Sequence, residues 1–560
     1  MQKGIISEAT SRNWKRLRSK KGGRLMARAN KQLSTKSIVP MEYFSNRSNV
    51  ADIQRFINFC KENEYKVEDV VFSVGVKLLK DAGILDKSHV KRVLKENSIK
   101  PIPTILNYAL PTDEFDLLGL IYQCFLLEGE KNRNGSYYTP YSVAKNMVQG
   151  LDFSNGQTFF DPCCGSGAFL LALEGASPSQ VFGCDNDPVA VMIAKINLLL
   201  KYKSEIFELQ IIKCDYLKQN FKYKKSYIIS NPPWGAVLFD DKNNPIPTRE
   251  SFSFFFEKSF NQLEENGIIR FLLPESVLNV KTHRNFREFL LENTDIQSIT
   301  LYDGAFSGVQ TKYIDIACRQ FDRSSNKSIF VKDFSTSLRS AQNDVMISEQ
   351  CFHLTINLNF NLLSDLDLEK VKKILSKGKY TLKDSIWGLG IVTGDNKKHL
   401  KTKQGRGFEP IYTGKEIEVY SLKDPKYFIR YKRAGYQQVA KDEIYRADEK
   451  LVYKFISKNL VFAYDDSKSL VLNSANVLIP RIPGMSVKTV MAFLNSSTFK
   501  FLYKSLFGEI KILKGNLLEL PFPEISEETN KKLTNLVDEV LKGNKEAAQL
   551  IDNEVATLFS

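Results

Sequence analysis

Histidine and paired cysteine are scarce in this 560-residue sequence, and both absences limit its chemistry. The four histidines lie far apart, and the eight cysteines include no Cys-x-x-Cys pair. This argues against a disulfide framework and against a zinc site. No apolar run approaches the roughly 18 to 20 residues that span a bilayer, and the start lacks a signal-peptide core. We therefore expect a cytoplasmic protein that contacts no membrane and whose chemistry needs neither metal nor histidine.

Acidic residues are scarce at the N-terminus, where Glu8 and Glu42 face a large excess of lysine and arginine over residues 1–50. The whole chain has a net charge of +15, which points to an anionic partner such as nucleic acid. A helix N-cap candidate, Ser7, precedes a basic stretch. We expect a basic arm over 1–50, either part of a small helix-turn-helix or simply a solvated helix or flexible arm.

The length predicts two or three domains, and 43% hydrophobic with 26% charged residues is typical of a globular protein. Residues 51–134 show helical periodicity, for example Ile53, Phe56, Ile57 and Cys60. This pattern predicts a helical N-terminal region.

An α/β unit follows, which begins with a short apolar strand at 158–160 and continues through a glycine loop at 161–167 into an apolar helix from Leu170. Strand, glycine loop and helix form the nucleotide-binding start of a Rossmann-like fold. Before it, Thr139 and Pro140 are expected as the N-cap and first residue of a helix, whose start can bind a carboxylate.

Two further strands end in acidic residues. Asp185, followed by Asn186, ends the strand that begins at Val181 and is placed to bind ribose hydroxyls. Asp215 and Tyr216 end the next strand, where a carboxylate and an aromatic ring could hold an adenine. The loop lacks a third phosphate-binding glycine and a Lys-Ser/Thr pair, which argues against ATP or a dinucleotide. A ligand with adenosine and carboxylate halves but no phosphate fits S-adenosylmethionine.

The tetrapeptide Asn231-Pro232-Pro233-Trp234 follows the apolar run 227–230. Two prolines fix φ and supply no N–H, so the turn is stiff and its carbonyls can point into a cleft. Asn231 and the Pro232 carbonyl could accept hydrogens from an exocyclic amine, and Trp234 offers a flat face for a base. The alternative is an ordinary Pro-Pro turn beside a core tryptophan.

Taken together and in this order, these motifs resemble the gamma-class, TaqI-like amino-methyltransferases of DNA. The fourth residue of the last motif is usually Tyr or Phe in that family, so Trp234 departs from the common pattern. The resemblance implies a second stacking aromatic at Phe306, with Tyr302 and Tyr313 as alternatives. It also implies cofactor contacts at positions Tyr138, Thr139, Asp161, Cys163, Gly165, Gly167, Asp185, Asn186, Asp215 and Tyr216. Cys163 and Cys164 lie in the cofactor loop, where we expect them to be structural and not nucleophiles.

Segments near 388–396, 410–417, 493–496 and 520–523 resemble the TaqI-like target-recognition domain. We expect a catalytic domain over 135–325, a mixed α+β recognition domain over 326–523 and C-terminal helices over 524–560.

The sequence thus predicts a site-specific enzyme that flips an adenine out of double-stranded DNA and methylates its N6. It would act as a monomer, either alone or with a cognate restriction endonuclease on a separate chain. Three alternatives stay open: an N4-cytosine enzyme, a release-factor or ribosomal-RNA methyltransferase, and a partner-dependent modification subunit of a restriction complex.

Overall fold

The computed structural model describes residues 41–126, 139–234, 250–302, 312–320, 328–334, 345–508 and 510–560. The chain divides into two compact units, one that runs to Glu349 and one formed by Gln350–Ser560. Most of the predicted basic arm lies outside the described residues; its last ten residues contain the short turns η1, Met41–Tyr43, and η2, Arg47–Asn49.

A twisted sheet forms the centre of the first unit, in the order β3-β2-β1-β4-β5-β7-β6-β8-β9 among the described strands. Strands β1 to β5 pair in parallel, whereas β7 runs antiparallel to both β5 and β6. The chain winds outward from β1 to β3 and then returns to β4 on the other side of β1, which creates a topological switch point between β1 and β4. The strands are β1 Phe159–Asp161, β2 Val181–Asp185, β3 Gln210–Lys213, β4 Lys225–Ser230, β5 Leu263–Pro274, β6 Thr294–Tyr302, β7 Tyr313–Gln320, β8 Ser328–Phe334 and β9 Val345–Ser348.

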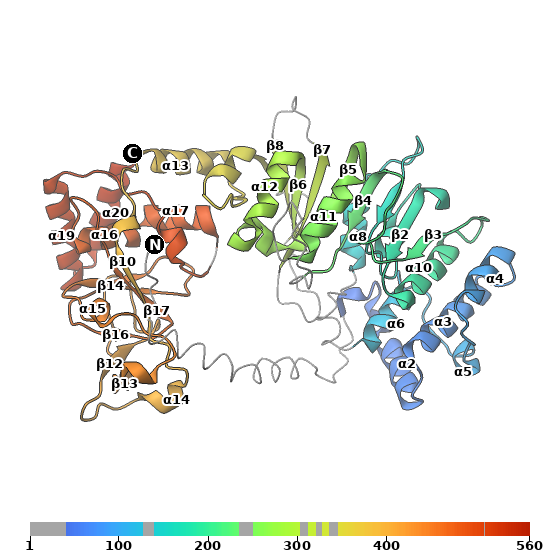
Figure 1. The fold of residues 1–560 in the computed structure, drawn as a ribbon, viewed down its shortest axis with the longest axis horizontal. Coiled ribbons are helices and arrows are strands. Elements are labelled where there is room, and N and C mark those ends of the chain that lie inside the picture. Colours follow the sequence, from blue (N-terminus) through green and yellow to red (C-terminus); the bar gives the residue numbers. More distant parts are fainter. Residues whose placement is uncertain are drawn as a thin grey trace. The chain divides into compact units, whose positions relative to one another are not determined.

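Helices cover both faces of this sheet, which explains why its central strands are apolar on both sides. Phe159 packs in one core with residues of α8 Tyr141–Val148, α9 Ala168–Ala172 and α10 Pro188–Lys201. The next residue, Phe160, points the other way and lies 5.8 Å from the ring of Tyr216. On that second face Phe271 packs edge-on against Phe256 of α11 Ser251–Asn261, and α12 Arg284–Asn293 lies beside α11 (Figure 1).

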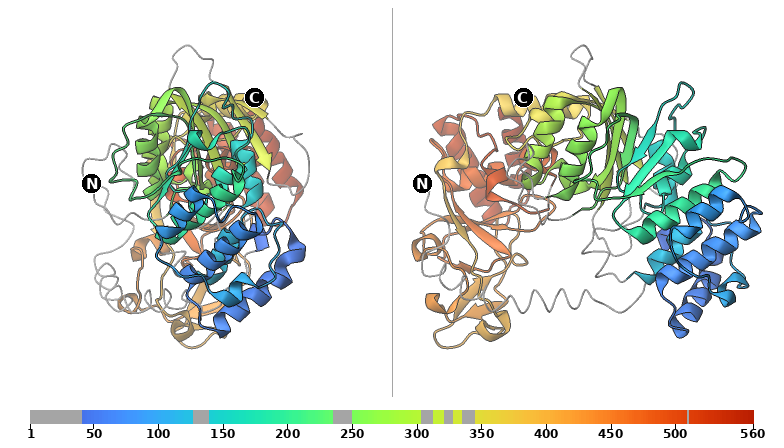
Figure 2. Two further views of the ribbon diagram at one scale, coloured as in Figure 1. Left: turned by 90° about the vertical axis from the view of Figure 1, so that its right-hand side faces the viewer. Right: turned by 45° about the vertical axis from the view of Figure 1, so that its right-hand side comes forward.

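The N-terminal region is helical, as its periodicity predicted. Its helices are α2 Val50–Glu62, α3 Val67–Asp81, α4 Ser88–Lys95, α5 Pro103–Leu106 and α6 Leu117–Phe125. The four residues that carry the predicted spacing, Ile53 to Cys60, are all buried. They share one core with Ile193 and Ile196 of α10, and Figure 2 shows these helices gathered beside α10. At the closest approach, a Cβ on Gly75 of α3 would collide with Ile196.

The second unit combines two small sheets with helices, the mixed α+β composition that the sequence predicted. One sheet has the order β10-β17-β14-β15 and the other β11-β13-β12-β16. Its strands are β10 Ile386–Leu389, β11 Leu400–Lys401, β12 Glu409–Tyr412, β13 Tyr427–Ile429, β14 Lys450–Lys454, β15 Phe462–Asp465, β16 Leu470–Val471 and β17 Ala475–Ile479. Its helices are α13 Asp365–Ser376, α14 Asn396–His399, α15 Asp442–Tyr445, α16 Val487–Asn495, α17 Ser497–Phe507, α18 Lys514–Leu517, α19 Glu527–Leu541 and α20 Glu546–Leu558.

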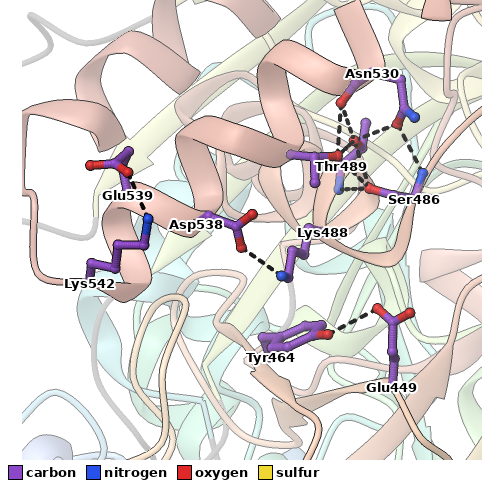
Figure 3. A network of polar contacts seen from close by, with 10 residues as sticks. Glu449, Tyr464, Ser486, Lys488, Thr489, Asn530, Asp538, Glu539 and Lys542 are labelled. Atoms are coloured by element: carbon purple, nitrogen blue, oxygen red, sulfur yellow. Dashed lines mark hydrogen bonds and ion pairs between the residues drawn. The ribbon is translucent and has the colours of Figure 1, made fainter.

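The C-terminal helices belong to the same core as the rest of this unit. Leu533 of α19 and Ile551 of α20 are buried in one cluster with Phe493 of α16. A polar network fixes α19 against the start of α16 (Figure 3): Asn530 Oδ1 accepts from Thr489 Oγ1 at 2.7 Å and from the Ser486 amide at 3.0 Å. Because both helices fill one core, residues after 523 stabilise the unit.

A buried ion pair joins two strands of this unit. Lys450 Nζ of β14 lies 2.6 Å from Asp465 Oδ2 of β15, and both side chains are fully buried. Burial alone would raise the pKa of Asp465, but Lys450 and the hydrogen bonds from Ser467 hold it below its usual value. Breaking such a pair is costly because it leaves one buried charge uncompensated.

We expect Asp465→Asn to destabilise the second unit by about 3 to 5 kcal/mol, the usual cost of isolating a buried charge. Hydrogen exchange of the β14 and β15 amides measures this loss. The matched control is Glu418→Gln, which breaks the exposed pair with Lys423 and should cost at most about 1 kcal/mol. Equal protection in the two variants would contradict the prediction.

Candidate active site

The switch point brings the ends of β1 and β4 together. Ser230 Oγ, at the end of β4, donates a hydrogen bond to Asp161 Oδ1 at 2.7 Å. The same oxygen accepts from the Cys163 amide at 3.0 Å, and Ser230 and Asp161 are both buried. One carboxylate therefore holds the start of the glycine loop against the residue that precedes Asn231.

The loop between β1 and α9 depends on its two glycines. Gly165 and Gly167 have φ of +52° and +92°, in the left-handed region that favours glycine. The Gly165 amide donates to Asp185 Oδ2 at 2.9 Å, and the Cys164 amide donates to the Cys184 carbonyl at 3.0 Å. The loop is thus closed against the end of β2.

Asp185 lies at the end of β2, as predicted. Its Oδ1 accepts from the Asp187 amide at 3.0 Å. Burial raises the pKa of Asp185, while the amides of Asp187 and Gly165 act in the opposite direction. Asn186 is exposed beside it. The carboxylate is held by backbone donors at the carboxyl end of the sheet, where open α/β folds bind ligands.

Asp215 and Tyr216 follow β3, but they differ in what they contact. Asp215 is exposed, and its Oδ1 accepts from the Leu217 amide at 3.2 Å. The Tyr216 ring is buried, and its hydroxyl lies 2.9 Å from Ser259 Oγ of α11. Stacking on Phe255 completes an aromatic cluster on the α11 face. These contacts favour a packing role for Tyr216, in place of the expected edge contact with a ligand.

Asn231 meets a residue that comes 92 positions earlier in the chain. Its Nδ2 donates to Thr139 Oγ1 at 3.3 Å. The sequence predicted Thr139 as the N-cap of the following helix, and this detail is wrong: α8 begins at Tyr141 with Pro140 at its N-cap and no side-chain cap. The Thr139 hydroxyl orients the Asn231 amide instead.

The rest of the tetrapeptide is anchored on both sides. The Pro233 carbonyl accepts a hydrogen bond from Ser251 Oγ at the start of α11. Trp234 is half-buried, and its Nε1 donates to the Leu272 carbonyl of β5 at 3.2 Å. Pro232 is buried between these anchors. The turn after β4 is therefore held by Thr139 before α8, by α11 and by β5.

Two predicted site residues, Tyr138 and Phe306, lie outside the described residues. The alternatives to Phe306 are placed: Tyr302 and Tyr313 are buried at the ends of β6 and β7 and stack on each other, 5.3 Å apart. The Tyr302 hydroxyl also donates to Asp315 at 2.7 Å. Both tyrosines belong to the sheet core, which disfavours them as partners of a base.

Sequence reasoning missed the contribution of α6 to this site. Asp116, the N-cap of α6, accepts from Ser166 Oγ in the glycine loop and from Asn197 Nδ2 of α10 at 2.8 Å. Burial raises the pKa of this carboxyl. An aspartate before the apolar run 117–122 does signal a helix start. Nothing in the sequence shows that its carboxylate also holds the glycine loop, because that contact spans 50 residues.

Comparison with known proteins places this arrangement in a family. The N-6 DNA methylase family matches residues 113–359, and the TaqI-like C-terminal specificity domain matches residues 409–522. The type II methyltransferase M.VspI of Vibrio sp. (strain 343) is 32% identical over 311 residues, which cover 53% of this chain and 74% of that protein. Switch-point sheet, glycine loop and acidic strand ends together define an S-adenosylmethionine-dependent methyltransferase. The chain belongs to the N-6 DNA methylase family.

More distant relatives include the type I restriction enzyme EcoEI methylase subunit of Escherichia coli, which is 26% identical over 36% of this chain and 46% of that subunit. Among solved structures, the type IIL restriction-modification enzyme MmeI, in complex with DNA, has a TM-score of 0.57. It is 12% identical, and the match covers 92% of this chain and 94% of MmeI. The MmeI similarity supports the fold. Within the described residues, no helix is long and apolar enough to cross a membrane.

The buried Asp161 predicts a pH dependence of stability. Burial raises its pKa to about 7, above its ordinary 3.8, although Ser230 and Cys163 act in the opposite direction. The folded state therefore binds more protons than the unfolded chain between these two values, so stability falls as pH rises from about 4 to 7.

Asp161→Asn keeps an oxygen acceptor but cannot titrate. We expect the stability of the wild type relative to this variant to decline with rising pH, by at most about 1.4 kcal/mol per pH unit. Hydrogen exchange of the β1 and β4 amides at pH 5 and pH 8, corrected for intrinsic exchange, measures it. A pH-independent difference would contradict the assignment.

Proposed function

We propose that this chain transfers a methyl group from S-adenosylmethionine to the N6 amine of an adenine that is flipped out of double-stranded DNA. The observation that carries the proposal is the position of Asn231. It directly follows β4 at the switch point, and Ser230 and Thr139 tie it to the glycine loop and to the segment before α8.

The chemistry of the amine explains why this position matters. The lone pair of an adenine amine is delocalised into the ring, so the enzyme must hold its hydrogens with acceptors and draw the nitrogen out of the ring plane. With Nδ2 turned toward Thr139, the Oδ1 of Asn231 lies on the opposite side of the amide carbon and accepts one hydrogen. The Pro232 carbonyl accepts the other.

The flipped base stacks on Trp234, with Phe306 as the proposed second aromatic. Base flipping costs a few kcal/mol, and stacking on an aromatic ring returns roughly 1 to 3 kcal/mol per base. Trp234 suits this role because the hydrogen bond from Nε1 to Leu272 fixes the plane of its ring.

The residues around the loop fit S-adenosylmethionine, which supplies an electrophilic methyl carbon when bound. Asp185 binds the ribose hydroxyls, and Asp215 binds the adenine. The loop from Asp161 to Gly167 supports the centre of the ligand, with Cys163 structural within it. Thr139 and Tyr138 are assigned contacts with the methionyl end of S-adenosylmethionine.

The second unit supplies target recognition, and double-stranded DNA is the partner. The proposal includes action as a monomer in the cytoplasm, with or without a cognate restriction endonuclease on another chain. The domain limits expected from the sequence, 135–325 and 326–523, are shifted in this proposal. Because β8 pairs with β6 and β9 with β8 in the sheet of the first unit, recognition is assigned to the second unit, from Gln350 onward.

Asn231→Ala should abolish methyl transfer while cofactor and DNA binding persist, because the variant loses an acceptor for the amine but no cofactor contact. Modification-sensitive sequencing of DNA from cells that express wild type or variant reports base, motif and activity together. Asn155→Ala, in an exposed turn of the same unit, is the matched control.

Methyladenine at a defined motif with the wild type and the control, but not with Asn231→Ala, is the expected result. N4-methylcytosine in that motif would refute adenine as the target. An active Asn231→Ala enzyme would refute the role of Asn231.

Asp185→Ala should weaken S-adenosylmethionine binding by about 10-fold to 100-fold, because a charged acceptor to a hydroxyl contributes about 1.5 to 3 kcal/mol. Calorimetric titration of the purified protein measures the change. Asp86→Ala, on an exposed loop, is the control. Unchanged affinity in the Asp185 variant would remove its ribose role.

A further inference from the structure

A small cavity lies beside the glycine loop and is lined by residues from α6, α8 and α9. It leaves about 20 Å³ for the centre of a water-sized sphere, which is room for a water or for the polar end of a ligand. Gln123, Gly119, Thr139, Tyr141 and Ala168 are among its lining residues.

Gln123 has no partner among the described residues that explains its presence there. It is 1% exposed, yet within that part of the chain neither its Nε2 nor its Oε1 has a hydrogen-bond partner. A buried amide left without partners costs free energy at both atoms, so each such group in a folded protein requires an explanation. A ligand that fills the cavity and pairs with both atoms supplies one.

The cavity adjoins the site described above through three of its lining residues. Thr139, in its wall, receives the hydrogen bond from Asn231, and Ala168 directly follows the glycine loop. Asp116, also in its wall, holds Ser166 of that loop. The cavity therefore lies where one end of a ligand bound along the loop would be placed.

We propose that Gln123 binds the amino-acid end of the methyl donor, an inference that rests on the proposed use of S-adenosylmethionine. That end carries one carboxylate and one ammonium group on the same carbon. A carboxamide offers one donor group and one acceptor, so Nε2 donates to the carboxylate while Oε1 accepts from the ammonium. An uncharged amide suits both charges, whereas a buried acid or base at this position would repel one of them.

With this proposal the helical N-terminal region also contacts the cofactor, in addition to the glycine loop. Asp116 caps α6 by accepting from the Gly119 amide and also accepts from Ser166 Oγ of the loop, which keeps Gln123 in register with the rest of the site. A Cβ on Gly119 would collide with both Asp116 and Ser166, which explains why α6 has a glycine facing the loop.

The test compares two adenosine ligands on the purified full chain by calorimetric titration. S-adenosylhomocysteine has the amino-acid end, and 5′-methylthioadenosine lacks it. Gln123→Met keeps the length of the side chain but removes both polar atoms. We expect it to weaken S-adenosylhomocysteine binding by about 10-fold, which corresponds to about 1.4 kcal/mol, and to leave 5′-methylthioadenosine binding within about 2-fold.

A second readout separates ligand binding from a structural role. Because Gln123→Met removes two unsatisfied buried polar atoms, the ligand-free variant should melt at a higher temperature than the wild type. A glutamine needed only for folding would give the opposite shift. The control is Gln54→Leu on α2, outside the cavity, which should alter neither ligand's affinity.

Gln123→Glu tests the pairing itself. Its carboxylate accepts from the ammonium group but repels the ligand carboxylate, so the variant should prefer the decarboxylated analogue of S-adenosylhomocysteine more strongly than the wild type does.

Equal losses for both ligands in Gln123→Met, or no loss for either, would overturn the assignment of Gln123 and leave the proposed adenine methylation standing. A wild type that binds neither ligand would overturn the use of S-adenosylmethionine and, with it, this inference. A wild type that binds S-adenosylhomocysteine normally but leaves DNA adenines unmodified would refute the proposed function alone.

Discussion

The hydrogen bond from Ser230 to Asp161 is the constraint on which the site depends. It joins two strands that are adjacent in the sheet but about 70 residues apart in sequence, at the point where the chain reverses its winding. Asp161 fixes the start of the glycine loop through Cys163, and Ser230 precedes Asn231. A shift of one strand against the other would separate the two halves of the site. The pair is fully buried, so water does not compete with this hydrogen bond.

The α/β fold and the places of the candidate site residues at strand ends and in the glycine loop could be predicted, because local patterns determine them. Glycines at positions that need a positive φ, an acid at the end of an apolar strand and a proline pair after another strand all reflect short stretches of backbone. The prediction of Thr139 as an N-cap was wrong because it used local sequence alone. A threonine before a proline is typical of a helix start, but the Thr139 hydroxyl accepts a hydrogen bond from Asn231, which lies in a distant segment. The burial of Tyr216 depends on an aromatic cluster assembled from three separate segments, which no local pattern reveals.

Buried charges at the glycine loop are stabilised differently from those in the ion pairs elsewhere in the fold. The first unit places Asp161, Asp185 and Asp116 near the glycine loop and satisfies them with backbone amides, hydroxyls and an amide side chain. The second unit neutralises its buried Lys450 directly with Asp465. Within the described residues Asp161 and Asp185 have no cationic partner, and burial raises their pKa at the ligand-binding end of the sheet, whereas a closed ion pair stabilises the fold. The first unit also closes such a pair away from the loop, where Arg270 Nε of β5 lies 2.6 Å from the buried Asp315 Oδ1 of β7. The contrast therefore separates the glycine loop from the rest of the fold.

The core shared by α2, α3 and α10 has a consequence for the order in which the chain acquires structure during synthesis. The helices before residue 126 emerge from the ribosome first, but Ile193 and Ile196, which complete their core, follow roughly seventy residues later. Until then the apolar faces around Phe56 and Val74 have no α10 to cover them, so they are open to chaperones and to aggregation. The N-terminal helices and the sheet are therefore one folding unit, and a boundary drawn at residue 134 for expression would cut through its interior.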